Sequence, residues 1–445
     1  MSEAVTCLLP NPNAAEPAAC VEPDRRPNAR GGRSRANAKS DRVAGADGLR
    51  ALACLWVFGH HVCQLWQWPR DGVSGFFRTH GPQGVAVFFV LSRLLLSLPF
   101  WQAFVAGDGF PNLKKYVMKR LARIVPGYYL CLGVMFAIYH DITAADLLRL
   151  LSAVTFTNSF HWRTYFPVKL DGACWSIGVK MMFYVLLPLW AAGWFRLKCL
   201  AAGRLFCVVT MAGLIGFQLV LSRWWPTISA PTTEAPHDFH QLATEWLPFR
   251  NPVGLFSHFL FGCLAASFFV RSSPFAPAGG EGPGVRGSVS RGVALNRWDL
   301  LAITTLAALW CELYLMSWNW LPQPVAGIVA SLWSRRELAC MNFGWPAFPL
   351  LVAILLVALS RSATVAGWFD NRILQKTATL SFGIYLWHTP VLHAIHEVWP
   401  VGIDLQPLWP AAFVAAALAS SYAVAWLSFR VVEKPALDLA RRAGF

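Results

Sequence analysis

The sequence predicts an all-α, polytopic integral membrane protein with about ten transmembrane helices, and three observations lead to this class. First, 56% of the 445 residues are hydrophobic and only 14% are charged, whereas a soluble domain carries about a quarter charged residues. Second, apolar stretches long enough to cross a hydrocarbon core of about 30 Å recur along the whole chain. Third, lysine and arginine are concentrated in alternate connecting segments, which is typical of membrane proteins.

Ten apolar stretches are the predicted spans. In chain order they cover residues 49–68, 83–101, 124–140, 174–194, 205–222, 252–270, 299–317, 344–360, 379–397 and 407–429. The third of these is short, and Pro346 and Pro349 interrupt the start of the eighth. A shorter apolar run near 320–333 is better suited to a re-entrant or surface segment than to a crossing.

The positive charges predict the orientation of these spans. If the amino terminus is cytoplasmic, the segments on that side carry 27 of the 38 lysines and arginines, and those on the other side carry nine. The remaining two, Arg93 and Lys180, lie inside spans. This threefold bias supports ten spans with both termini in the cytoplasm. We expect the membrane to be the plasma (inner) membrane. Because topology accounts for the net charge of +15, nucleic-acid binding is not expected.

The composition also predicts how the chain is divided. Residues 1–46 are expected to be a disordered, basic cytoplasmic tail that can touch anionic lipid headgroups. Residues 47–436 form the membrane domain, with a Gly/Pro/Ser/Arg-rich cytoplasmic linker near 271–298, and residues 437–445 form a second cytoplasmic tail. The eleven cysteines are scattered without a C-x-x-C pair or metal-ligand spacing, so no metal and no permanently bound cofactor are expected.

The first span, within ADGLRALACLWVFGHHVCQLW, carries the most informative polar pair. Arg50 and His61 are eleven residues apart, which places them within about 20° of one helical face and about 16 Å apart along the axis. An arginine at the cytoplasmic mouth suits a phosphate, and a histidine at depth suits a general base near neutral pH. The plainer alternative is a snorkelling arginine with a structural histidine. His60 points about 80–100° away and is the weaker candidate.

Polar residues in later spans are further candidates, because such residues are costly in lipid. Ser381, Tyr385 and His388 fall near one face of the ninth span and could line the same cavity as His61, although hydrogen bonding between helices is an equal alternative. Lys180 and Arg93 each place a positive charge inside the bilayer, at a cost of about 2.5–3.5 kcal/mol on the lenient insertion scale.

A series of motifs in this order resembles the membrane acyltransferase-3 family, whose members O-acylate extracytoplasmic glycans and some small molecules. The motifs are DGLRA followed by His61, VAVFFVLSRLLL, YVMKRLARIVPGYYL, WSIGVKMMFY, FRNPVGLFSHFLFGCLAA, LSFGIYLWHTPVL and FRVVEKPALDLARR. Matching positions include Asp47, Arg50, His61, Ser92, Trp175, Ser176, Tyr184, Ser381, Tyr385 and His388. Two positions depart from the pattern, because the family has glycine where Arg93 stands and glutamate where Lys180 stands.

The resemblance implies an integral-membrane O-acyltransferase that moves an acyl group, most commonly acetyl, from cytoplasmic acyl-CoA to a hydroxyl of an extracytoplasmic or lipid-linked glycan. Acyl-CoA would be a co-substrate, and His61 would deprotonate the acceptor or briefly carry the acyl group. The donor phosphates would meet Arg50 and cations of the third motif. These cations are Lys114, Lys115, Arg120 and Arg123. The other residues expected to line the site are Asp47, Ser92, Trp175, Ser176, Lys180, Tyr184, Ser381, Tyr385 and His388.

Two other classes of protein remain open. A transporter or flippase would also have about ten spans with buried polar groups, although the spacing of Arg50 and His61 favours the enzyme. A catalytically impaired homologue would explain why Lys180 and Arg93 depart from the family pattern. Lys180 therefore has three interpretations. It is a substitution that has damaged an active enzyme, a lysine that its surroundings keep neutral, or a cation that binds an anionic donor or acceptor.

Overall fold

A computed structural model describes the parts of the chain from which the architecture follows. These are residues 43–69, 72–139, 143–161, 163–165, 174–197, 199–228, 252–270, 295–316, 346–398 and 409–445. Within them every regular element is a helix and there is no strand, so the predicted all-α class is confirmed. Most of the amino-terminal tail, most of the linker near 271–298 and the apolar run near 320–333 lie outside the described residues.

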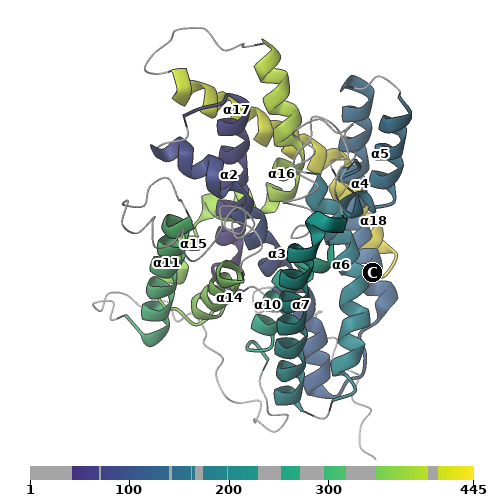
Figure 1. Cartoon of the computed structure of the whole chain (residues 1–445), viewed down its shortest axis with the longest axis vertical. Helices are drawn as coiled ribbons and strands as arrows, with labels where there is room; N and C mark the ends of the chain where they lie inside the picture. The colour runs from purple at the N-terminus through teal and green to yellow at the C-terminus, as the bar shows by residue number, and fades with distance from the viewer. Residues whose placement is uncertain are drawn as a thin grey trace, which may run out of the picture. The chain divides into compact units, whose positions relative to one another are not determined.

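A helix occupies each of the ten segments predicted as spans (Figure 1). The elements in chain order are α2 (Ala46–Leu65), α3 (Gly72–Ala106), α4 (Leu113–Tyr139), α5 (Ala144–Val154), η1 (Asn158–Phe160), α6 (Trp175–Trp194), α7 (Leu200–Ile228), α10 (Pro252–Ala266), α11 (Arg297–Met316), α14 (Ala347–Leu359), α15 (Val365–Phe369), α16 (Arg372–Val398), α17 (Trp409–Ser428), η4 (Phe429–Glu433) and α18 (Lys434–Arg442).

Five helical segments among the described residues are long and apolar enough to cross a membrane. They are Gly72–Ala106, Leu113–Ile138, Trp175–Trp194, Leu200–Gln218 and Ala411–Arg442. The helices α10 and α14 are apolar but shorter. The helices α2 and α16 are not among the five, and both carry several polar side chains, including histidines. The protein is thus an integral membrane protein, and the number of ten crossings remains a prediction.

The amino-terminal helices pack closely because glycines face their neighbours. α2 packs chiefly against α3 and α16, and α10 packs against α3. A Cβ on Gly84 of α3 would lie 2.9 Å from the carbonyl oxygen of Ala53, and one on Gly262 of α10 would lie 2.1 Å from that of Val90. Side chains at these two positions would therefore force the helices apart.

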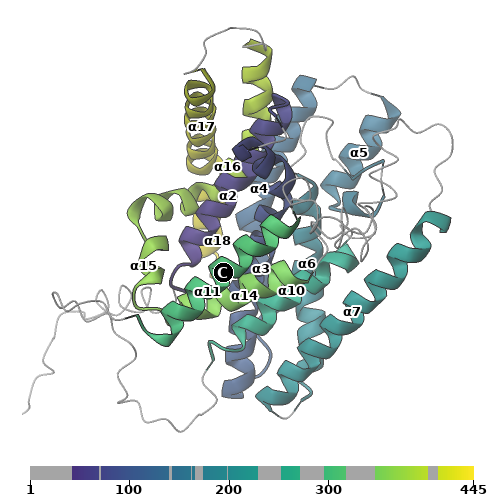
Figure 2. The same cartoon turned by 60° about the vertical axis from the view of Figure 1, so that its left-hand side comes forward.

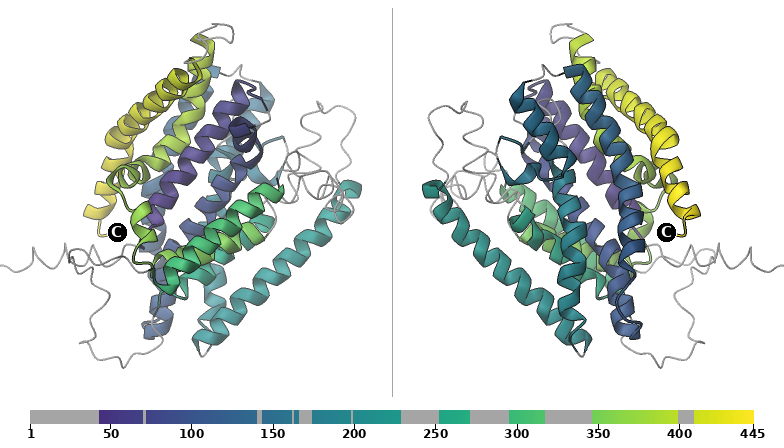
Figure 3. Two further views of the ribbon diagram at one scale, coloured as in Figure 1. Left: turned by 90° about the vertical axis from the view of Figure 1, so that its left-hand side faces the viewer. Right: turned by 90° about the vertical axis from the view of Figure 1, so that its right-hand side faces the viewer.

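Other helices surround this core. Figure 2 shows α7 on the outside of the bundle next to α10. Figure 3 shows the carboxyl-terminal run, in which α17 lies along α16 and α18 then lies along α4. Exposed leucine and valine side chains cover much of α7, as expected for a helix that faces lipid.

Segments that the charge pattern places on one side of the membrane meet at the start of α2. The backbone N–H of Gly45 donates to Asp370 Oδ2 at 3.1 Å, and a Cβ on Gly48 would lie 2.0 Å from the carbonyl oxygen of Phe369. At the start of α11, Asp299 accepts hydrogen bonds from the backbone N–H groups of Thr364 and Val365 at 2.9 and 3.0 Å. The contacts of Gly45 and Gly48 hold the Arg50 end of α2 against α15, and those of Asp299 join α11 to the start of α15.

Candidate functional site

Two histidines from helices far apart in the sequence form a direct hydrogen bond. His61 Nδ1 on α2 lies 2.8 Å from His388 Nε2 on α16, and the two ring centroids are 4.9 Å apart. The other nitrogen of His388, Nδ1, lies 3.0 Å from the carbonyl oxygen of Ile384, one turn earlier in α16. His388 is 1% exposed, whereas His61 is partly exposed. Hydrogen bonds therefore fix both ring nitrogens of His388, whereas the ring of His61 remains partly accessible.

Cysteine thiols hold α16 beside α2 and α4. Pro390 has no backbone N–H, which leaves the carbonyl of Leu386 without its usual helical donor. The thiol of Cys131 on α4 donates to this carbonyl at 3.5 Å, and the thiol of Cys54 on α2 donates to the carbonyl of Ser381 at 3.5 Å. Cys54 and Cys131 thus help to set the position of α16, which carries His388.

The neighbouring histidine, His60, faces a different helix. Its Nδ1 lies 2.9 Å from the carbonyl oxygen of Phe77 on α3, and its ring centroid is 5.0 Å from that of His61. A Cβ on Gly81 of α3 would overlap the His60 ring. His60 therefore lies in the packing between α2 and α3, while His61 faces α16.

The three residues that share a face of α16 meet different partners. The Tyr385 hydroxyl lies 2.7 Å from Ser176 Oγ on α6, and the Tyr385 ring centroid is 6.0 Å from that of His388. The Ser381 hydroxyl donates to the carbonyl of Ala378 in its own helix at 2.8 Å. Tyr385 therefore links α16 to α6 beside the histidine pair, whereas the Ser381 hydroxyl is bonded within α16.

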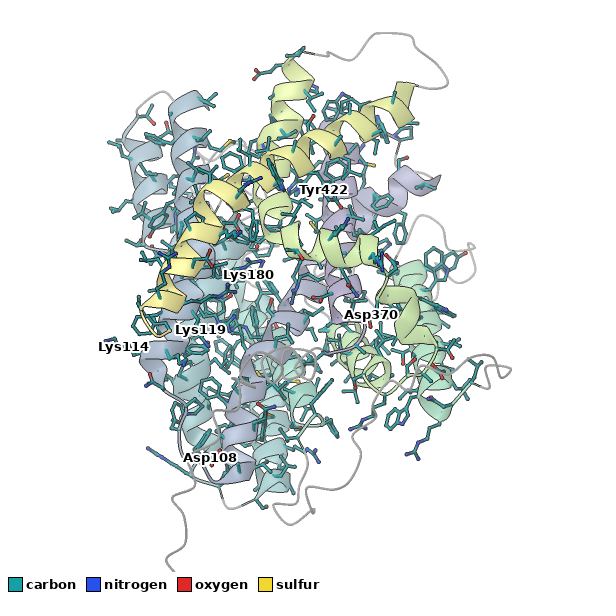
Figure 4. All side chains as sticks on the ribbon, turned by 180° about the vertical axis from the view of Figure 1, so that it is seen from behind. Asp108, Lys114, Lys119, Lys180, Asp370 and Tyr422 are labelled. Carbon is teal, nitrogen blue, oxygen red and sulfur yellow. The ribbon has the colours of Figure 1, made fainter. Side chains whose placement is uncertain are left out.

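Lys180 lies among aromatic rings in the middle of the bundle (Figure 4). Its Nζ is 4.7 Å from the ring centroid of Tyr385, 5.2 Å from that of Phe88 and 5.9 Å from that of Phe89. The residue is 9% exposed. Cation–π contacts of this kind are worth about 0.5–2 kcal/mol each. These rings therefore offset part of the cost of burying the ammonium group.

Arg93 on α3 lies in a second aromatic cluster next to Lys180. Its guanidinium carbon is 4.2 Å from the ring centroid of Phe259, 4.9 Å from that of Tyr184 and 5.0 Å from that of Phe183. Its NH2 group donates to the backbone carbonyl of Lys180 at 3.2 Å. Neither aromatic cluster could be predicted from the sequence, because aromatic residues are abundant throughout the chain and their partners lie on other helices.

The two buried cations have no acidic partner in the described part of the chain. No described carboxylate lies within 4.0 Å of Lys180 or Arg93, and Nε and NH1 of Arg93 make no hydrogen bond there. A Cβ on Gly262 would lie 2.9 Å from the Cβ of Arg93. The glycine on α10 thus leaves room for the Arg93 side chain where α3 and α10 approach closely.

The Arg50 end of α2 holds a group of charged residues. Arg50 NH1 pairs with Asp47 Oδ1 at 3.4 Å, and Arg123 of α4 is near enough to act on Arg50 electrostatically. Glu433 in η4 is buried and is in the electrostatic field of Arg123. The Arg430 guanidinium lies over the Trp426 ring, with its central carbon 5.2 Å from the centroid.

The remaining predicted cations lie in other places. Arg120 is half-buried and acts electrostatically on Arg93 rather than on Arg50. Lys114 and Lys115 are exposed at the start of α4, and Lys114 Nζ is 5.6 Å from the ring centroid of Phe445. Figure 4 shows Lys114 at the outer edge of the helices, well away from Lys180. Only Arg123 therefore joins Arg50.

Two further predicted residues, Trp175 and Ser92, are not part of the histidine pair. Trp175, at the start of α6, stacks on Tyr165 with ring centroids 5.4 Å apart, and its carbonyl accepts a hydrogen bond from Ser159 at 3.2 Å. Ser92 on α3 is half-buried, and its hydroxyl makes no hydrogen bond to a described residue. Trp175 therefore belongs to the packing around α6.

Comparison with known proteins gives a family and distant relatives. A model of the family described as acyltransferase domain matches residues 43–430. Peptidoglycan O-acetyltransferase OatA of Listeria monocytogenes is 24% identical over 424 residues, which cover 91% of this chain and 56% of that protein. Nodulation protein 10 of Rhizobium leguminosarum is 26% identical over 415 residues, which cover 87% of this chain and 91% of that protein. The chain thus spans about half the length of the Listeria protein. No solved structure matches the chain.

Proposed function

Because the chain belongs to the acyltransferase domain family, we propose that it is an integral-membrane O-acyltransferase that transfers an acyl group from cytoplasmic acyl-CoA to a hydroxyl of an extracytoplasmic or lipid-linked glycan. The observation that carries the proposal is the hydrogen bond of 2.8 Å between His61 and His388. It presents an oriented imidazole inside a membrane bundle. The relative named as a peptidoglycan O-acetyltransferase supports acetyl as the acyl group and a glycan as the acceptor.

His61 acts as the general base in this proposal. It removes the proton from the acceptor hydroxyl while the oxygen attacks the thioester carbonyl carbon of acyl-CoA. The new C–O bond forms, the C–S bond breaks, and the imidazolium returns the proton to the departing thiolate. A positioned base of this kind contributes a rate factor of about 10²–10⁴. In the covalent variant of the same reaction, His61 carries the acyl group between the two substrates.

Arg50 and Arg123 hold the donor in this proposal. Arg50 lies near the start of α2, where it pairs with Asp47, and Arg123 of α4 is near enough to act on it electrostatically. Arginine presents a planar fork of N–H donors that matches phosphate oxygens. A donor whose phosphates sit at Arg50 must reach about 16 Å along α2 to place its thioester at His61, and the extended pantetheine arm of acyl-CoA suits that distance.

A catalytically impaired homologue is the second candidate, and Lys180 with Arg93 favours it. A glutamate at position 180 would give the cluster one negative charge, whereas this chain has two adjacent cations and no described carboxylate within 4.0 Å of either. An uncompensated charge inside the bilayer costs about 2.5–3.5 kcal/mol on the lenient insertion scale, and the two adjacent cations also repel each other. A protein with this defect would keep the fold and lose activity.

Acyl transfer tests the proposal directly. We expect membrane vesicles containing the protein to move label from [14C]acetyl-CoA to a lipid-linked or polymeric glycan as an alkali-labile ester. Vesicles with the His61→Ala variant at equal protein level are the matched control. Movement of the glycan across the membrane without labelling would support a transporter. Absence of labelling, with a protein that melts cooperatively, would support the impaired homologue.

The proposed topology makes a separate prediction. Reporter tags inserted after residue 285 and at the carboxyl terminus should both report the cytoplasm, and a tag near Pro236 should report the exterior. The reason is the excess of lysine and arginine in the predicted inside segments. Both internal tag sites lie outside the described residues. Opposite sidedness at any of the three sites, measured by alkaline phosphatase and green fluorescent protein fusions, would contradict ten crossings.

A further inference from the structure

We infer that His388 is a positioning residue that fixes the tautomer of His61, so that the lone pair of His61 lies on Nε2, away from His388. The inference rests on the proposed function for its catalytic meaning, but its structural content stands on hydrogen bonds alone. It assigns distinct roles to two histidines that a sequence comparison would treat alike. His61 exchanges the proton, and His388 decides which nitrogen of His61 can do so.

The tautomer of His388 is set by a carbonyl of its own helix. The carbonyl oxygen of Ile384 can only accept a hydrogen bond, so His388 Nδ1, 3.0 Å away, must carry the hydrogen. A neutral imidazole has one N–H, which leaves Nε2 of His388 as an acceptor. Because Ile384 lies one turn earlier in the same helix, α16 itself selects this tautomer whenever His388 keeps its rotamer.

His388 in turn determines which ring nitrogen of His61 carries the hydrogen. Since His388 Nε2 is an acceptor, His61 Nδ1, 2.8 Å away, must be the donor. A neutral His61 then has its lone pair on Nε2, which is the nitrogen left for a substrate. The hydrogen bond on one ring nitrogen generally decides the protonation of the other. The relay therefore runs from the Ile384 carbonyl through His388 to His61.

The hydrogen bonds that run from Ile384 through His388 to His61 stay intact during the reaction. When His61 Nε2 takes a proton, His61 Nδ1–H still donates to His388 Nε2, so nothing in the pair has to rearrange. A second proton would have to go to His388 Nε2, and the two facing N–H groups would then break the hydrogen bond. The pair thus works as a base for one proton.

A neutral orienting group also differs from a carboxylate in its effect on the imidazolium. A carboxylate beside the base would stabilise the imidazolium by charge, as the aspartate of the Ser-His-Asp triad does. His388 gives orientation without that charge, so His61 releases its proton more readily. Ready release suits a reaction in which the same imidazole must return the proton to a departing thiolate.

Nuclear magnetic resonance of ring-15N-labelled histidine in the full chain in detergent tests the inference without an activity measurement. In the parent, the His61 signal, assigned by its loss in His61→Gln, should show Nδ1 protonated and Nε2 unprotonated. In His388→Leu, which removes the acceptor, His61 should shift toward the Nε2-protonated tautomer or a mixture. A parent in which His61 is protonated at Nε2 would overturn the inference, even if the protein is an active acyltransferase.

Kinetics give the second measurement. His388→Leu should lower kcat by about 10²–10⁴-fold, because losing the group that fixes the tautomer costs about 10⁴ in the Ser-His-Asp triad. The KM for acyl-CoA should stay within about threefold of the parent's, since orienting the base acts on the chemical step more than on ground-state binding. His388→Gln keeps an acceptor oxygen near the position of Nε2 and should recover much of the loss. His396→Leu, on the same helix against Trp66, is the matched control and should change kcat little.

The outcomes separate the two proposals. Equal losses in His388→Leu, His388→Gln and His396→Leu would show a structural role for α16 and overturn the inference. If the parent transfers no acyl group but its His61 has the expected tautomer and loses it in His388→Leu, the relay stands and the proposed function fails. If His388→Leu does not fold, the parent tautomer and the His388→Gln variant still decide the matter.

Discussion

Replacing His61 with alanine should abolish measurable acyl transfer while leaving protein level and melting temperature near those of the parent. The loss follows from removing the base, which alone contributes a factor of about 10²–10⁴, together with the oriented N–H···N hydrogen bond. The folded state loses one hydrogen bond to His388 Nε2, which costs about 1–3 kcal/mol if the buried acceptor stays unpaired. That cost is small against a typical stability of about 5–15 kcal/mol. Labelled acyl transfer and thermal unfolding in detergent measure the two effects.

His60→Ala is the control for this variant, because it removes the adjacent imidazole. Its Nδ1 contacts the carbonyl of Phe77 rather than α16, so the effect should fall mainly on the packing of α2 against α3. We expect a milder loss of activity and a larger relative loss of stability. Equal losses of transfer from the two alanine variants, or normal transfer by His61→Ala, would remove His61 as the assigned base.

The apolar spans could be predicted from the sequence because hydropathy is a local property. The predicted spans agree in position with helices, but α3 begins at Gly72 and α16 at Arg372, well before the predicted starts. Hydropathy locates the part of a helix that suits lipid, and these helices continue into polar residues. α5 was missed for a related reason. Its Leu147 and Leu151 are exposed and its Asp146 is buried, which is an amphipathic pattern rather than a uniformly apolar one.

The site was predictable only within single helices. The spacing of Arg50 and His61 follows from the geometry of one helix, and so does the shared face of Ser381, Tyr385 and His388. Which helix each side chain faces depends on packing between segments hundreds of residues apart. The bond from His61 to His388 and the contact from Tyr385 to Ser176 therefore came from the structure. The carbonyl of Ile384 could not be predicted at all, because its role does not depend on its side chain.

Replacing Lys180 with glutamate should raise both the melting temperature and the rate of acyl transfer if the lysine is damage to an active enzyme. The Arg93 guanidinium already contacts the backbone of residue 180 at 3.2 Å, so a carboxylate there would face a buried cation. The change removes an uncompensated charge that costs a few kcal/mol in the bilayer. It gives up cation–π contacts with Tyr385, Phe88 and Phe89 worth about 0.5–2 kcal/mol each. Lys180→Met, which removes the charge and keeps the length, separates the loss of repulsion from the gain of an ion pair.

Because Arg93 and Lys180 are in contact, the stability changes caused by substituting each of them should not add, and a double-mutant cycle will measure the difference. Alone, Arg93→Gly should stabilise the parent, because it removes one of two adjacent cations. After Lys180→Glu, the same change should destabilise, because Arg93 has become the counter-ion of the new carboxylate. This reversal of sign is expected only for residues in contact, since sites more than about 7–10 Å apart add. The measurement is thermal unfolding and acyl transfer for the parent, both single variants and the double. An active parent whose activity is destroyed by Lys180→Glu would show that the lysine has a positive role, such as holding an anionic donor, and would exclude the damaged-enzyme interpretation.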